Sequence, residues 1–287
     1  MRDLSFSPVI LWLGVALALI GTVAFLMWTP GDLLRTADYI GAAVCHRLPD
    51  HSFIIDGHQL PLCQRCSGTF PGALTGVLVQ WGLWRRRRST SFPRWFLLIP
   101  VVLFAGMWGL DGVNSATSES QIYDLLQPWF PRSAGVGILG YAPQPWLRLL
   151  TGALMGMGMS IVLVPAFNQT LWSDGETSRT VRNWHEMAAL LVIELGMAAL
   201  IYLLVPLPSA VGIYGVSLYS ALGVLTMFVL LGAMMFCLLL QREGSVAGWR
   251  SAAVPLIWGF VFALSLVTVM DVTRLWVTGT IDGVPGL

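Results

Sequence analysis

The densest group of chemically reactive side chains lies within residues 45–76, which read CHRLPDHSFIIDGHQLPLCQRCSGTFPGALTG. Three of the four cysteines and three of the four histidines fall in this stretch. Cys63 and Cys66 have two residues between them, which is the spacing of a chelating pair or of a redox dithiol. Cys45 and His46 lie upstream, so the pattern resembles half of a typical zinc site. The stretch runs directly into an apolar segment, which places its chemistry at the end of a membrane helix.

Three interpretations of these cysteines are open. In the first, Cys45, Cys63 and Cys66 bind a soft metal ion, with zinc the expected cofactor, and a histidine or water is the fourth ligand. In the second, Cys63 and Cys66 are a redox pair whose thiolate is stabilised by the helix N-terminus and by Arg65, and Cys45 resolves it. In the third, a disulfide only fixes the loop to the helix. We favour the metal.

The fourth metal ligand must come from the histidines or from solvent. His46 is the first candidate because it adjoins Cys45. Adjacent side chains rarely point at one ion, so His58 is the main alternative and His51 a further one. Cys237 lies in the apolar run MMFCLLL, where an inert buried thiol is expected.

A second group of ionisable residues lies near the ends of predicted membrane helices. Asp111 closes one helix in GLDG, and Arg148 opens another in WLRLLTG. Asp271 and Arg274, near the end of the last helix, either join the same pocket or form a self-paired couple at i,i+3 spacing. Because charge near hydrocarbon is costly unless it is paired or faces a cavity, we expect a polar pocket beside the cysteines. Glu194, in the middle of LVIELGM, is a neutral buried acid, a proton-relay group or a partner for an arginine.

The composition sets the environment in which this site must form. Of the 287 residues, 56% are hydrophobic and only 11% are charged, and the mean hydropathy is +0.73. These values exclude a soluble protein and predict one all-α, polytopic membrane domain over residues 1–287. The net charge of +1, without a basic stripe, gives no sign of a nucleic-acid partner. All sixteen cationic side chains are arginine, which excludes lysine chemistry.

Apolar runs of the length that a bilayer requires predict about seven spans. They lie at residues 8–28, 67–84, 94–110, 146–165, 186–205, 213–240 and 252–277. A short interfacial helix is expected before Cys45, and a loop at 49–62. Gly68, Gly72 and Gly76 recur at every fourth position, which predicts a flat ridge for close helix packing, with Gly152 and Gly156 as its counterpart.

The arginines predict the orientation. The run Arg85–Arg88, followed by Arg94, fills one short connection and marks the cytoplasmic side. Ten of the sixteen arginines then fall on that side. The N-terminus is therefore expected inside, and the connections 29–66 and 111–145 outside. The cysteine loop, Asp111, Arg148 and Arg274 would all face the extracytoplasmic leaflet.

These motifs resemble those of a family of prokaryotic multi-pass membrane proteins known as domain of unknown function 2085. The resemblance covers roughly residues 40–160, whereas the last spans, 186–277, lie outside it. The matching residues are Cys45-His46, Ser52-Phe53, Gly57-His58-Gln59, Pro61, Cys63-x-Arg65-Cys66-x-Gly68, Gly72, Asp111-Gly112 and Leu147-Arg148-x-x-Thr151-Gly152. The family has no settled activity, so the resemblance implies an uncharacterised protein of the prokaryotic inner membrane whose cysteine, aspartate and arginine motifs form a site.

The leading functional hypothesis is an extracytoplasmic zinc site beside an Asp–Arg pocket. In an enzyme, zinc would activate water or act as a Lewis acid, Asp111 would be the acid or base, and Arg148 or Arg65 would hold an anionic group such as a lipid phosphate. With four protein ligands the metal would be structural. The alternatives are a thiol oxidoreductase using Cys63 and Cys66, and a transporter or accessory subunit of a membrane complex. Whether the protein is an enzyme stays open.

Overall fold

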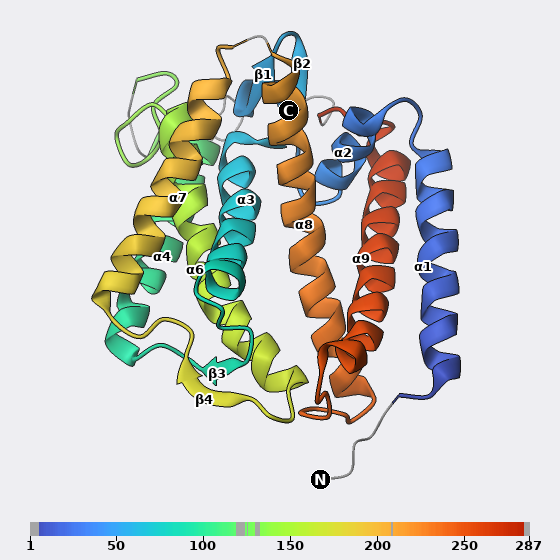
Figure 1. Ribbon diagram of the computed structural model, residues 1–287. Helices are drawn as coiled ribbons and strands as arrows, with labels where there is room; N and C mark the ends of the chain where they lie inside the picture. The colour runs from blue at the N-terminus through green and yellow to red at the C-terminus, as the bar shows by residue number, and fades with distance from the viewer. Residues whose placement is uncertain (1–5, 119–123, 125, 130–132, 208, 284–287) are drawn as a thin grey trace.

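The computed structural model describes residues 6–283 except 119–123, 125, 130–132 and 208. It is a mostly helical bundle, drawn in Figure 1, whose small strands form no closed sheet. Among the described residues, six helices are long and apolar enough to cross a membrane. They are α1 (Pro8–Trp28), α4 (Trp95–Ser118), α6 (Pro145–Leu171), α7 (Trp184–Leu204), α8 (Ala210–Leu239) and α9 (Trp249–Thr278).

The predicted span at 67–84 corresponds to a shorter element. Here the chain forms α3 (Gln64–Leu78) and continues into η2 (Val79–Leu83), a π-helical turn. This segment is not among the six spanning helices, so the count of seven stays a prediction. α3 nevertheless lies inside the bundle, between α6, α7 and α8 (Figure 1).

Glycine packing explains the central position of α3. A Cβ atom placed on Gly68 would lie 2.2 Å from the carbonyl oxygen of Leu149, and one on Gly152 would lie 2.0 Å from that of Arg65. A Cβ atom on Gly156 would lie 2.2 Å from the carbonyl oxygen of Thr69. Only glycine permits such backbone approach, so the predicted glycine ridge and its counterpart on α6 are confirmed.

Residues 49–62 correct one expectation, because they form a hairpin and not a loop. After the short η1 (Pro49–His51), β1 (Ser52–Ile55) pairs antiparallel with β2 (His58–Cys63). Asp56 and Gly57 have φ values of 49° and 76°, the two positive values that a type I′ hairpin turn requires. The Asp-Gly pair flanked by apolar residues was the available signal. The interfacial helix expected before Cys45 is present as α2 (Leu33–Ala42).

A second correction concerns the end of α4. The helix continues to Ser118 and does not close at Asp111, which therefore lies two turns inside it. Asp111, Asn114 and Ser115 are buried. Their polar side chains lower the hydropathy without ending the helix, because they face protein and not lipid.

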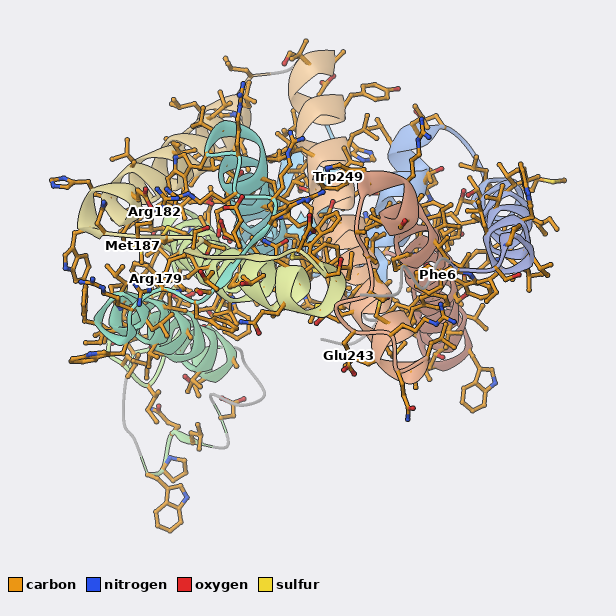
Figure 2. All side chains as sticks on the ribbon, turned by 60° about the horizontal axis from the view of Figure 1, so that its bottom comes forward. Phe6, Arg179, Arg182, Met187, Glu243 and Trp249 are labelled. Atoms are coloured by element: carbon orange, nitrogen blue, oxygen red, sulfur yellow. The ribbon has the colours of Figure 1, made fainter. Side chains whose placement is uncertain are left out.

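The two ends of the bundle differ in character. The hairpin and α2 lie at one end, whereas β3 (Ser89–Ser91) and β4 (Glu176–Arg179) pair in parallel at the other. Figure 2 shows that other end, where Arg179 and Arg182 come forward. Arg86 there forms an ion pair with Glu186. We call these the cysteine end and the arginine end.

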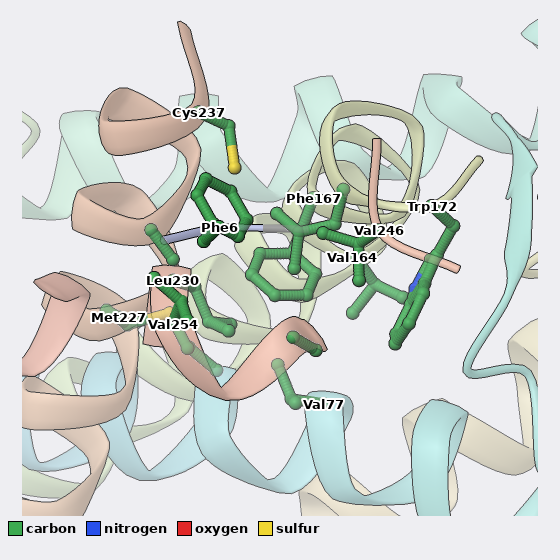
Figure 3. Close-up of a cluster of buried hydrophobic side chains, with 14 residues drawn as sticks. Phe6, Val77, Val164, Phe167, Trp172, Met227, Leu230, Cys237, Val246 and Val254 are labelled. Atoms are coloured by element: carbon green, nitrogen blue, oxygen red, sulfur yellow. The ribbon is translucent and has the colours of Figure 1, made fainter. Parts of the chain in front are cut away.

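Hydrophobic clusters fill the space between the helices. The cluster in Figure 3 includes Phe6, Phe167 and Trp172 and lies toward the arginine end. Cys237 belongs to it and has no exposed surface, in agreement with the burial expected from its apolar run.

Candidate metal centre

Three sulfur atoms meet at the cysteine end. The Sγ atoms of Cys45, Cys63 and Cys66 all lie within 4.8 Å of one another. Cys45 follows α2, Cys63 is the last residue of β2, and Cys66 lies in the first turn of α3. Cys45 and Cys63 are buried, whereas Cys66 is half-buried. Among the described residues this is the one group of three or more such ligands close enough to hold a metal ion.

Hydrogen bonds among these residues favour the thiolate form of one cysteine over the other two. The amide N–H of Cys63 donates to the Sγ atom of Cys45 at 3.1 Å. Hydrogen bonds from the side chains of Cys45, Cys66 and His46 lower the pKa of Cys63 well below its ordinary value. The hydrogen bond with Cys63 raises the pKa of Cys45 to about 12. Of the three thiols, Cys63 is thus the one whose surroundings favour the thiolate form.

His46 is the histidine nearest to the sulfurs, and its hydrogen bonds define its role. Its Nδ1 atom accepts a hydrogen bond from the amide N–H of Leu48 at 3.1 Å. A neutral imidazole that accepts at Nδ1 carries its proton on Nε2. His46 is thus arranged to donate a hydrogen bond to the Cys63 sulfur, a different role from that of a metal ligand.

The other two candidate histidines lie in different surroundings. His51 packs against His46 with ring centroids 5.5 Å apart. Its burial and the nearby charge of Arg148 lower its pKa to about 4, so it is neutral. His58 is separated from Cys63 by five positions on β2 and so points to the opposite face. Its Nε2 atom is 3.6 Å from Asp38 Oδ1. The structure does not bring His58 to the sulfurs.

The loop that carries Cys45 is fixed by Arg274 of α9. Its guanidinium donates to the carbonyl oxygens of Ala42 at 2.9 Å and of His46 at 2.8 Å, and also to that of Cys45. Asp271 and Arg274 do not form an ion pair in the described part of the chain, so the self-paired couple is wrong. Both oxygens of Asp271 are buried and have no hydrogen-bond partner among the described residues, although Arg274 is within electrostatic range.

Asp111 and Arg148 belong to one buried polar network, in which the partner of Asp111 is Arg65. That this network forms a binding pocket stays a prediction. Asp111 Oδ2 accepts from Arg65 Nη2 at 2.6 Å and from Arg65 Nε at 3.2 Å. Tyr141 donates to Asp111 Oδ1 at 3.2 Å. Arg148 Nε donates to Ser115 Oγ at 3.2 Å, and the same oxygen accepts from Arg65 Nη2 at 2.9 Å. Ser115 therefore links the two arginines.

This network is joined to the cysteine centre through the first turn of α3. Arg65 lies between Cys63 and Cys66 in the chain, and Arg148 Nη1 donates to the neighbouring Gln64 at 3.3 Å. Sequence reasoning found Arg65, Asp111 and Arg148 but missed Gln64, Ser115 and Tyr141. Uncharged polar residues are common in membrane helices, so their residue type does not identify a site until the helix packed against them is known.

A groove of about 480 Å³ borders the centre beside Cys45 and His46. It runs between the loop of Cys45 and His46 and the last turns of α9, where Met270 and Thr273 line it. Trp276 on the same turns is 86% exposed.

The comparisons with known proteins are consistent with this description. Residues 45–162 match a family model described as a predicted membrane protein, domain of unknown function 2085. This confirms the family resemblance. The matched domain contains the three clustered cysteines, Asp111 and Arg148, whereas α7, α8 and α9 lie outside it.

Two curated relatives are similar to parts of the chain. An uncharacterised protein of Methanocaldococcus jannaschii is 24% identical over 132 residues, which are 45% of this chain and 67% of that protein. An uncharacterised protein of Methanothermobacter thermautotrophicus is 47% identical over 35 residues, 12% of this chain and 32% of that protein. No solved structure matches the chain. The descriptions of these relatives therefore suggest no activity for the matched region.

Proposed function

We propose that Cys45, Cys63 and Cys66 bind one zinc ion on the extracytoplasmic face of a prokaryotic inner membrane. The observation that carries the proposal is the mutual approach of the three sulfurs within 4.8 Å. Tetrahedral zinc with bonds of about 2.3 Å holds its sulfur ligands about 3.8 Å apart, so small shifts of side chains suffice. The lowered pKa of Cys63 also favours a thiolate ligand at that position.

The fourth position of this ion is proposed to hold water or a substrate oxygen. His46 supports the idea because it is arranged as a hydrogen-bond donor to Cys63. Three protein ligands with one exchangeable position are typical of catalytic zinc. The groove beside Cys45 and His46, which residues of α9 such as Met270 and Val277 line, favours a lipid-like substrate.

Asp111, Arg65 and Arg148 act in this proposal as positioning residues. The ion pair between Arg65 and Asp111 fixes the turn that carries Cys63 and Cys66. Arg148 supports the same turn through Gln64. The orientation rests on the arginine end, whose charged residues favour the cytoplasmic side.

Metal analysis of detergent-purified protein tests the proposal. We expect about one zinc ion per chain, with loss of zinc in Cys63→Ser and in Cys66→Ser. Cys237→Ser is the matched control, since this buried thiol lies in another cluster and should leave the zinc content unchanged. Protein without bound metal, purified under conditions that keep the thiols reduced, would overturn the zinc site.

A thiol oxidoreductase is the second candidate, favoured by the lowered pKa of Cys63. The Cys63 thiolate would attack a disulfide of a partner, and Cys66 or Cys45 would resolve the mixed disulfide. Thiol counting separates the two functions. A Cys63–Cys66 bridge that forms and reduces reversibly, in protein that contains no zinc, would favour this candidate.

A further inference from the structure

Glu194 is a carboxyl group enclosed in the middle of the bundle, apart from the cysteine centre. It lies halfway along α7 and has no exposed surface. Neither of its carboxyl oxygens has a hydrogen-bond partner among the described residues, and no ion pair there includes it. A buried ionised carboxylate without a partner is very costly, so a group of this kind is retained neutral.

The space around Glu194 is shaped by the glycine ridge of α3. A Cβ atom on Gly72 would lie 3.2 Å from Glu194 Oε2, and one on Gly76 would lie 3.5 Å from Glu194 Oε1. Both oxygens therefore point at a face of α3 that has no side chains. On the side of α8, Tyr219 is within electrostatic range of Glu194, and its hydroxyl is hydrogen-bonded to Thr75 at 2.8 Å.

Two polar side chains, Ser160 and Gln80, lie between this carboxyl group and the arginine end. The Cβ position on Gly76 lies 2.0 Å from Ser160 Oγ, so Ser160 and Glu194 approach the same face of Gly76. Among the described residues no hydrogen bond joins the two side chains, and Ser160 Oγ donates to the carbonyl oxygen of Met157 at 2.8 Å. A proton that passes between Ser160 and Glu194 would need a bridging water molecule. Gln80 Nε2 donates to Ser160 Oγ at 3.1 Å, and Gln80 Oε1 is buried without a partner.

Gln80 brings the connection close to the end of the bundle. It lies in the π-helical turn η2, an irregularity that often marks functional positions in helices. Its backbone carbonyl accepts from the amide N–H of Arg86, a residue of the arginine end. This backbone hydrogen bond joins η2 to the arginine end, so Gln80 is a buried polar side chain between Glu194 and that end.

We infer that Glu194 is a proton-binding site that exchanges its proton with water at the arginine end through Ser160 and Gln80. On uptake, hydronium transfers a proton to the carboxylate oxygen and leaves as water, and on release the reverse occurs. Tyr219 is the titratable group that faces Glu194 from α8. The described residues that α3 and α6 present to it, Gly72, Gly76 and Ser160, carry no charge. The inference does not depend on a metal at the cysteines.

Infrared spectroscopy of the protein in lipid tests this inference. A protonated carboxyl in an apolar site gives a distinct C=O stretching band, which moves when deuterium replaces the proton. We expect the wild type to show this band and its shift in D₂O, and Glu194→Gln to lose both. Glu176→Gln, at an exposed position of β4, is the matched control and should keep the band. Gln80→Leu should slow the isotope exchange about tenfold, the effect of removing one hydrogen bond from the path.

Two results would overturn the inference. A band that keeps its position in D₂O would show a trapped proton with no exchange. Exchange at the wild-type rate in Gln80→Leu would exclude the proposed path. If Glu194→Gln does not fold, a hydrophobic carbodiimide, which modifies protonated buried carboxyl groups, is applied to the wild type. Modification mapped to Glu194 by mass spectrometry supports the site, and its absence there contradicts it.

Discussion

Two buried polar regions of this bundle are built in opposite ways. In the Asp111 region, Oδ1 accepts a hydrogen bond from Tyr141, and Oδ2 accepts hydrogen bonds from Nε and Nη2 of Arg65. In the Glu194 region, neither carboxyl oxygen has a partner among the described residues. Both carboxyl groups are almost fully buried, so their difference lies in the partners and not in the depth.

The difference separates two uses of a buried carboxyl group. A carboxylate that is paired and fully hydrogen-bonded fixes its own element to the one that supplies its partner. Here Asp111 fixes α4 to Arg65 of α3. A carboxyl without partners contributes nothing to that rigidity, but it can accept a proton without first breaking a contact. The Asp111 region therefore supports the cysteine centre, whereas the Glu194 region is available for binding a proton.

The largest expected effect on stability comes from neutralising Asp111, and the same change at Glu194 provides the comparison. Asp111→Asn should lower the free energy of unfolding by about 3 kcal/mol, because it leaves the charge of Arg65 without its partner. Glu194→Gln should change it by less than about 1 kcal/mol, since one neutral group replaces another of the same size. Thermal unfolding of both variants in one detergent makes the comparison. Equal losses of stability would remove the distinction between the regions.

An intermediate effect is expected at the two polar residues of α9. Arg274→Gln removes the donors to Ala42 and His46 and should weaken zinc binding by about tenfold to a hundredfold, as loss of a supporting contact does. Asp271→Asn is the matched control, because its oxygens have no partner to lose.

Competition with a chelator measures the affinity of each variant. Hydrogen exchange of residues 42–48 gives a second measure that does not depend on metal, and it should rise in Arg274→Gln alone. A similar rise in Asp271→Asn would contradict the role given to Arg274.

The cysteine centre shows how far spacing alone can predict a site. Cys63 and Cys66 were recognisable because a strand end and the first helical turn bring residues at this separation together. The glycine ridge was recognisable for the same reason, since helical periodicity is local. Asp111 was predicted to be important, but its partner was not, because the pairing with Arg65 depends on which face of α4 meets α3.

Three other features were missed, each for a different reason. Hydropathy reports where lipid contact ends, so the buried polar face of α4 beyond Asp111 was read as a loop. The role of Arg274 lies in bonds to backbone carbonyls, and these leave no trace in residue types. Asp38 and Arg47, which form a buried ion pair at 2.9 Å, were also missed. Neither residue is remarkable by spacing, and the fold of α2 against the loop is needed to bring them together.

The smallest expected effect concerns a carboxyl group that is paired at the surface. Asp282 accepts two hydrogen bonds of 2.9 Å from Arg35 and one of 3.2 Å from Arg47. The hydrogen bonds from Arg35 in particular lower its pKa below the ordinary value of 3.8. A carboxyl with a lowered pKa stabilises the folded state above pH 3.8, and this contribution is lost as the pH falls through the lowered pKa.

Acidification should therefore loosen the segment 279–283, because Asp282 loses its charge and with it the pairing to Arg35 and Arg47. Hydrogen exchange of that segment, compared with Asp282→Asn at the same pH, measures the effect. The wild type should be better protected than the variant at neutral pH, and the difference should vanish under strong acid. The Asp282 side chain is 47% exposed, so solvent screens its pairing and the effect should be well below that of Asp111→Asn. Equal protection of residues 279–283 in the wild type and in Asp282→Asn at neutral pH would mean that a surface pairing of this kind adds nothing to the fold, in contrast to the buried pair of Arg65 and Asp111.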